Sequence, residues 1–202
     1  GYTVNYYIKG TTAAVPGLAP LTGNAPIGEF TWSNAPKTAT GYKLVTSPAQ
    51  PASMTITAAG PNQKNVYYEI DDMQKFGYTV NYFIKGTTTV VPGLVPLTGS
   101  VPVGTFTWSN APKTTTGYKL VSSPAQPVSM TITAAGPNVK TVYYEVDDTQ
   151  KFGYTVNYYI KGTTTAVPGL APLTGNAPLG EFTWSNASKT TTGFKLVAGQ
   201  PD

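Results

Sequence analysis

The chain has 202 residues, of which 40% are hydrophobic and 11% charged, and its net charge of +4 comes from 13 lysines against 9 acidic residues. It contains no cysteine, which excludes disulfides, thiolate chemistry and Cys-based metal sites. The lysines are scattered singly and arginine is absent, so we expect no nucleic-acid binding, and no apolar stretch is long enough to insert in a membrane.

The most prominent feature of the sequence is an internal repeat. The opening GYTVNYYIKG returns almost unchanged at Gly77 and Gly153, an interval of 76 residues. Aligned without a gap, residues 1–76 and 77–152 differ at 15 positions, and most differences keep the size class of the side chain. The third copy, 153–202, has 50 residues. The period suits a small domain better than a solenoid coil, so we expect two complete units and one partial unit.

Alternating apolar and polar residues at the start of the unit predict a β-strand over residues 2–9. The inner face of this first strand is expected to hold Tyr2, Val4, Tyr6 and Ile8. Residues 15–26 carry three prolines and two glycines, so we expect an ordered loop there rather than a helix.

Four more short segments of the unit have the composition of strands. They are EFTWS, GYKLV, SMTIT and KNVYYEI, with a Gly-Pro-Asn turn between the last two. No stretch of useful length shows the helical period of 3.6 residues, so we predict a mainly β fold. The residues expected to point inward from these segments are Phe30, Trp32, Leu44, Met54, Ile56, Val66, Tyr68 and Ile70.

The segments between units, Asp71 to Phe76 and its copy ending at Phe152, are short and neither Gly/Ser-rich nor Pro-rich. We therefore expect stiff junctions, with the two phenylalanines packed there, and an elongated rod of units. The third copy lacks the last two strands of the unit. The true boundaries could thus be offset by about 26 residues, or each 50-residue block could be a domain with a separate hairpin between blocks.

An ordered series of short motifs resembles the mucin-binding-protein (MucBP) repeats of Gram-positive surface adhesins. The series is TVNYYIKG, LTG at Leu21–Gly23, PIGEFTW, GYKLV at Gly41–Val45, SMTITAAG and VYYE at Val66–Glu69. The resemblance implies tandem β-grasp, ubiquitin-like modules with little helix, placed outside the cell on a bacterial cell wall. The partners that it implies are mucin or other host glycoprotein glycans, and we expect a monomer. The alternative fold is a series of Ig-like β-sandwich repeats.

Aromatic residues are the candidates for glycan binding, because their faces stack on sugar rings while nearby amides form hydrogen bonds. The tryptophan of FTWSN has a second interpretation, which we favour, as the core residue of each unit. Aromatic residues on the outer face of the strands are better candidates, although they could also serve only to stabilise the sheet. The candidate ligand-binding residues are Tyr7, Trp32, Asn34, Tyr67, Phe83, Trp108, Asn110, Tyr143, Tyr159, Trp184 and Asn186.

Acidic clusters at the unit junctions are candidates for calcium binding. They supply oxygen ligands close together, but the loop pattern that calcium usually requires is absent. The alternative is a solvated acidic turn balanced by Lys75 and Lys151. The candidate metal ligands are Glu69, Asp71 and Asp72, and Glu145, Asp147 and Asp148.

We expect no enzymatic activity, since neither histidine nor cysteine is present and no convergent catalytic set is found. A Lys–Asn isopeptide cross-link is a further hypothesis. It would require Lys9 or Lys43 to be buried beside Asn5 or Asn34 and a carboxylate.

Two hypotheses about function remain. In the first, the chain is the repeat region of a bacterial surface adhesin. Linked weak binding sites can then exceed the affinity of a single site by about 10²-fold or more. In the second, it is a purely structural stalk that projects another domain. A binding module should group outward aromatic residues beside a groove, whereas a stalk should bury them beneath a Thr/Ser surface.

Overall fold

The computed structural model describes residues 1–34, 38–110, 115–184 and 191–198. These residues form strands and turns without any helix, which confirms the prediction of a mainly β fold. The chain packs into two compact units, and the second repeat contributes to both. The first comprises Gly1–Asn81, Pro96–Ser109 and Pro127–Thr141, and the second comprises Tyr82–Val95, Asn110–Gln126 and Val142–Asp202.

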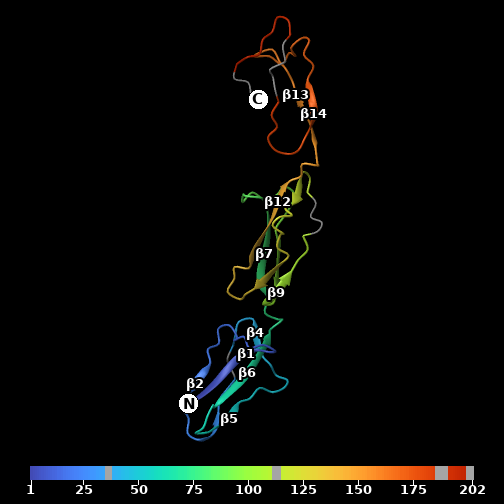
Figure 1. The fold of residues 1–202 in the computed structure, drawn as a ribbon. Helices are drawn as coiled ribbons and strands as arrows, with labels where there is room; N and C mark the ends of the chain where they lie inside the picture. Colours follow the sequence, from blue (N-terminus) through green and yellow to red (C-terminus); the bar gives the residue numbers. More distant parts are fainter. Residues whose placement is uncertain (35–37, 111–114, 185–190, 199–202) are drawn as a thin grey trace. The chain divides into compact units, whose positions relative to one another are not determined.

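The first repeat builds a four-stranded mixed sheet in the order β2-β1-β6-β4 (Figure 1). The two central strands run parallel, and their register extends from Thr3 opposite Gln63 to Ile8 opposite Tyr68. Both outer strands are antiparallel to their neighbours. A parallel central pair does not fit the Ig-like alternative, whose sheets are antiparallel. The strands are β1 (Tyr2–Ile8), β2 (Leu21–Gly23), β4 (Tyr42–Leu44) and β6 (Gln63–Ile70).

A second, two-stranded antiparallel sheet lies in the same repeat. It pairs β3 (Gly28–Thr31) with β5 (Ser53–Ile56), and Phe30 stands opposite Met54 in the register. Side chains of a strand alternate between its two faces, so Phe30 and Met54 project toward the same side as Ile56. This side packs against the core of the repeat.

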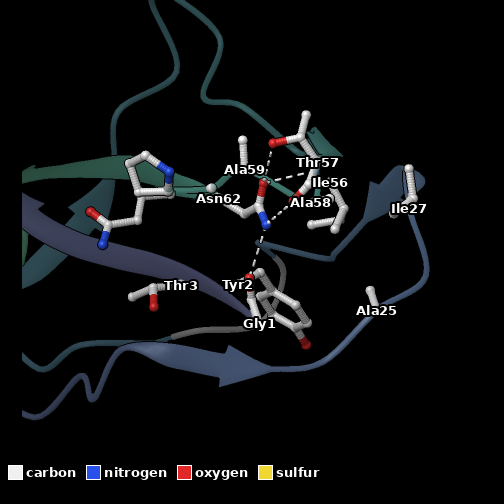
Figure 2. A pocket seen from close by; sticks show the side chains of 13 residues that line it. Gly1, Tyr2, Thr3, Ala25, Ile27, Ile56, Thr57, Ala58, Ala59 and Asn62 are labelled. Carbon is white, nitrogen blue, oxygen red and sulfur yellow. Dashed lines mark hydrogen bonds between the residues drawn. The ribbon is translucent and has the colours of Figure 1, made fainter.

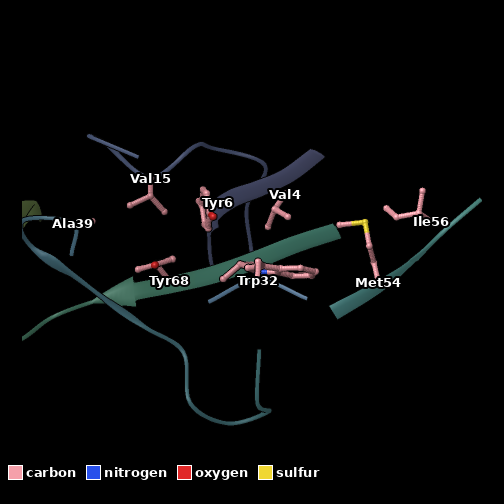
Figure 3. Close-up of a cluster of buried hydrophobic side chains, with 9 residues drawn as sticks. Val4, Tyr6, Val15, Trp32, Ala39, Met54, Ile56 and Tyr68 are labelled. Carbon is pink, nitrogen blue, oxygen red and sulfur yellow. The ribbon is translucent and has the colours of Figure 1, made fainter. Parts of the chain in front are cut away.

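The core of the first repeat consists of the inward residues of these strands (Figure 3). Tyr6 and Tyr68 meet edge to face with ring centroids 6.2 Å apart. Burial, and then the neighbouring Tyr6, raises the pKa of Tyr68 above its ordinary value of 10.0. A fully buried side chain of the size of valine, isoleucine or methionine contributes about 1.5–3 kcal/mol to stability. The buried members are Val4, Tyr6, Val15, Trp32, Ala39, Met54, Ile56, Val66 and Tyr68.

Three details differ from the sequence expectations. Within the expected loop of residues 15–26, Leu21–Gly23 forms strand β2, because its main chain pairs with Tyr2–Val4. Ile70 is exposed rather than inward, since it lies at the end of β6. Leu44 is half-buried, whereas the next residue, Val45, is buried.

The second repeat forms the same arrangement, with a sheet in the order β10-β12-β7-β8 and a separate β11–β9 pair. Main-chain hydrogen bonds from Thr79 N to Asn138 O (2.9 Å) and from Lys85 N to Tyr144 O (2.7 Å) join the central strands. Bonds of the same lengths join Thr3 to Asn62 and Lys9 to Tyr68 in the first repeat. The strands are β7 (Phe76–Ile84), β8 (Leu97–Val101), β9 (Gly104–Thr107), β10 (Tyr118–Leu120), β11 (Ser129–Ile132) and β12 (Val139–Val146).

The third copy contains β13 (Phe152–Val156) and β14 (Leu173–Ala177), which pair antiparallel. Its aromatic contacts follow the earlier repeats, because the ring centroids of Tyr154 and Phe182 are 4.1 Å apart, as are those of Tyr2 and Phe30.

Candidate functional site

The tryptophan of the first repeat lies in the core. Trp32 is 8% exposed, and its indole N–H donates a hydrogen bond to Asn34 Oδ1 at 2.8 Å. The Asn34 side-chain amide donates in turn to Pro51 O at 2.7 Å. The pair therefore ties the core to the loop before β5, and the indole face is covered by protein.

The corresponding residues of the other copies are placed in a similar way where they are described. Trp108 and Trp184 are half-buried, and Asn110 is buried. Asn186 lies outside the described residues. The structure thus buries Trp32 and Asn110, while Trp108 and Trp184 keep part of their surface exposed.

Two outward aromatic residues of the first repeat lie next to each other. Tyr7 on β1 and Tyr67 on β6 are direct partners in the parallel register, and both are half-buried. They alternate with Tyr6 and Tyr68, which point into the core, so they occupy the opposite face of the sheet. The structure therefore brings together two of the predicted ligand-binding residues. We call Tyr7 with Tyr67, and the corresponding Phe83 with Tyr143, the outer aromatic pairs.

The outer aromatic pair of the second repeat keeps this placement. Hydrogen bonds at both ends of β7 and β12 match those of the first repeat, which puts Phe83 beside Tyr143. Phe83 is half-buried and Tyr143 is exposed. In the third copy Tyr159 is 53% exposed, more than Tyr143.

An open groove of about 730 Å³ lies beside Tyr67 in the first repeat. Its lining includes the aromatic residue Tyr67 and the polar residues Lys9, Thr11, Thr12 and Gln50. Val45 and Pro48 add apolar surface. A concave surface of this kind can hold a ligand that has both an apolar face and hydroxyl groups.

Gln50 shapes this groove and was not identified from the sequence. Its Oε1 accepts a hydrogen bond from Tyr67 N at 2.8 Å, and its Nε2 donates to Pro48 O at 3.0 Å. Gln126 makes the same two bonds in the second repeat, at 2.7 and 2.9 Å. The only indication in the sequence was the identical PAQP in both repeats, because glutamine itself has no motif.

The predicted calcium ligands have other partners. Glu69 lies between Lys9 Nζ at 3.7 Å and Lys43 Nζ at 3.9 Å, and Glu145 lies 3.3 Å from Lys85 Nζ. These pairs are partly exposed to solvent, where such a pair contributes about 0–1 kcal/mol. The side chains of Lys9 and Lys43 are about half exposed, so they do not meet the burial that an isopeptide cross-link requires.

The aspartates at the junctions stabilise a turn. Asp71 accepts hydrogen bonds from Gln74 Nε2 at 2.8 Å and from Met73 N at 3.2 Å, and these two bonds lower the pKa of Asp71 below 3.8. Gln74 Oε1 accepts from Gly41 N at 3.0 Å, which fastens the turn to the start of β4. Asp147 and Gln150 form the same network in the second repeat, where Thr149 also donates to Asp147.

Asp72 and Asp148 are exposed beside these turns. Among the residues that the structure describes, no group of three His, Cys, Asp or Glu side chains could hold a metal ion. The structure therefore does not bring the predicted calcium ligands together, and the solvated acidic turn describes these residues better.

A second hollow, of about 440 Å³, lies at the opposite end of β1 from the groove (Figure 2). Asn62 lines this hollow, and its side-chain amide forms three hydrogen bonds there. Its Oδ1 accepts from Thr57 N at 2.9 Å, and its Nδ2 donates to Gly1 O and Thr57 O at 3.1 and 3.0 Å. No aspartate, glutamate or lysine lines the hollow. Since the amide of Asn62 is fully used in holding the turn, we interpret this hollow as structural.

No protein-family model matches the chain, and no curated protein matches its sequence. Within the described part of the chain, no helix is long and apolar enough to cross a membrane.

Proposed function

We propose that this chain is the repeat region of a bacterial cell-surface adhesin, located on the cell wall, that binds glycans of mucin or other host glycoproteins. The binding surface is the outer aromatic pair of each complete repeat, together with the groove that adjoins the pair in the first repeat. The motif series that resembles MucBP repeats supports this proposal. So does the strand arrangement, because a β-grasp sheet also places its first and last strands side by side and parallel at the centre.

The observation that carries the proposal is the position of Tyr7 in register with Tyr67, which itself lines the groove. Neighbouring rings on one sheet face form an apolar platform of the size of a sugar ring. Lys9, Thr11 and Gln50 supply donors and acceptors at the edge of that platform. An aromatic platform with polar groups at its edge is the combination expected of a glycan-binding module.

A purely structural stalk is the second candidate. The burial of Trp32 and the use of Asn34 in holding a loop favour it, since both residues then serve stability alone. The partial exposure of the outer aromatic pairs favours the adhesin.

Binding of the whole chain to immobilised mucin tests the proposal. Periodate opens the sugar rings of the mucin while leaving its polypeptide in place, so a periodate-treated surface is the matched control. We expect saturable binding to intact mucin and at least about tenfold weaker binding after periodate, given that two complete repeats act together. Binding no stronger than to a bare surface would support the stalk instead.

A further inference from the structure

The first and last strands of the first repeat are direct neighbours in space. The chain enters this repeat through β1 and leaves it through β6, and β2, β3, β4 and β5 all lie between these two in the sequence. β1 and β6 pair in parallel, from Thr3 opposite Gln63 to Ile8 opposite Tyr68 (Figure 1). Because the pairing is parallel, the start of β1 lies at one end of the pair and the end of β6 lies at the other.

Contacts on both faces of the sheet hold these two strands together. Main-chain hydrogen bonds of 2.9 and 2.7 Å join the strands at the two ends of their pairing. On the outer face, Asn5 Nδ2 donates to Asn65 Oδ1 at 3.2 Å, and Lys9 Nζ lies 3.7 Å from Glu69 Oε2. On the inner face, side chains of both strands belong to the buried core. The two strands are therefore joined along their whole paired length.

The direction of a pull decides how this pair comes apart. Tension along the chain pulls β1 at its start and β6 at its end, in opposite directions parallel to the strands. The hydrogen bonds of the pair are then stretched together, whereas a pull at one end of the pair, across the strands, would open them one at a time. A single hydrogen bond adds little to stability in water, so resistance depends on how many bonds must break together.

The second repeat has the same arrangement within a continuous chain. β7 and β12 are neighbours at the centre of its sheet, and main-chain hydrogen bonds of 2.9 and 2.7 Å again join them. Lys85 Nζ lies 3.3 Å from Glu145 Oε2, as Lys9 lies close to Glu69 in the first repeat. The strands β8, β9, β10 and β11 lie between β7 and β12 in the sequence. Both complete repeats therefore enclose their remaining strands between the two that the chain pulls on.

We infer that each complete repeat is a load-bearing element, in which the central parallel pair acts as a shear clamp. The shear clamp is β1 with β6 in the first repeat and β7 with β12 in the second. While the clamp holds, the strands enclosed between its two members carry no load. This function goes beyond glycan binding and does not depend on it. Tyr7 and Tyr67 lie on the two clamp strands, so their register is kept for as long as the clamp holds.

Single-molecule force spectroscopy of the whole chain tests this inference on the first repeat. The chain contains no cysteine, so pairs of introduced cysteines attach the two handles at chosen points. Gly1→Cys with Asp72→Cys pulls the clamp in shear, and Gly1→Cys with Gln63→Cys pulls its two strands apart at one end. All three positions are exposed. At equal pulling speed we expect an unfolding force at least about twofold higher for the shear pair, because forced unfolding follows the barrier to unfolding.

A second control pulls the same strands apart from their other end. Thr12→Cys with Asp72→Cys places both handles beyond the ends of β1 and β6, again at exposed positions. This pair should unfold at the low force of the Gly1/Gln63 pair. The length of chain released assigns each event to the first repeat, since every residue between the handles adds up to about 3.6 Å. An unfolding force of the Gly1/Asp72 pair no higher than that of either control pair would overturn the inference.

Discussion

At the scale of the residue, two adjacent positions on a strand have opposite roles. Tyr68 packs edge to face against Tyr6 in the core, while Tyr67 lies on the outer face beside Tyr7. Trp32 is buried in the core, as Tyr68 is, because it lies two residues after Phe30 and therefore on the same, inward face. Side-chain type alone therefore does not decide between core and surface, but position along the strand does.

The core role of Trp32 predicts a large loss of stability on truncation. We expect Trp32→Ala to lower the free energy of unfolding of the first repeat by about 3–5 kcal/mol, through lost apolar burial and the cavity left behind. Urea denaturation measures this loss. The control Ile27→Ala, at an exposed side chain, should change stability by no more than about 0.5 kcal/mol. Unchanged stability together with lost mucin binding in Trp32→Ala would place the indole in the binding site.

The aspartate turn predicts a dependence of stability on acid pH. The hydrogen bond from Gln74, and then that from Met73 N, lowers the pKa of Asp71, so the contribution of Asp71 is fully present above its unfolded pKa of 3.8. It is lost as pH falls through the lower pKa of the folded state. Denaturation midpoints at about pH 5 and about pH 3 should therefore differ more in the original chain than in Asp71→Asn.

Asp72→Asn is the matched control for this prediction, since Asp72 is the exposed neighbour. The stability of the Asp72→Asn variant should fall between about pH 5 and about pH 3 as steeply as that of the original chain. A fall of equal steepness in Asp71→Asn would show that the turn does not hold the charged form of Asp71.

At the scale of the element, the turn before β4 determines how closely neighbouring segments of the first compact unit approach. Gly41 has φ +87°, and a methyl group on its Cα would lie 2.6 Å from Val103 Cγ1 and 3.4 Å from Phe76 Cε2. These residues all belong to the first compact unit. Gly117 has the same surroundings in the second, where Leu179 and Phe152 lie against it. The contacts agree with the expectation that Phe76 and Phe152 pack at the junctions.

Substituting alanine for Gly41 should therefore cost more than backbone strain alone. Gly17 is the matched control, because its φ is +82° but its surroundings are open. Both Gly17→Ala and Gly41→Ala carry the strain of a left-handed conformation, about 1–2 kcal/mol. We expect Gly41→Ala to lose at least about 1 kcal/mol more, through overpacking against Val103. Thermal denaturation of both variants compares the losses, and equal losses would show that Val103 moves aside freely.

At the scale of the whole molecule, strands and their inner faces could be predicted from the sequence, while their pairing could not. Burial follows the period of two along each strand, so Val4, Tyr6, Val66 and Tyr68 were identified as inward from the pattern alone. The short strand Leu21–Gly23 depends on a partner distant in the sequence and was predicted as a loop.

The same limit applies to the candidate site. Outward aromatic residues could be identified from strand phase, but the position of Tyr7 beside Tyr67 follows from a parallel pairing of residues 60 positions apart. The roles of Gln50 and Gln74 depend on side-chain hydrogen bonds to a distant main chain, which no local pattern reveals. An elongated arrangement of the units and a monomeric state stay predictions.

The most direct test of the proposed binding surface compares the mucin affinity of two double variants of the whole chain. Tyr67→Thr with Tyr143→Thr removes one ring of each outer aromatic pair and keeps a strand-forming residue. Gln63→Thr with Val139→Thr, at exposed positions of the same strands, is the control. We predict at least about tenfold weaker binding for the tyrosine variant, from the loss of one aromatic contact in each of two repeats, and unchanged binding for the control. Equal affinity of the two variants for mucin would contradict the assignment of binding to the outer aromatic pairs.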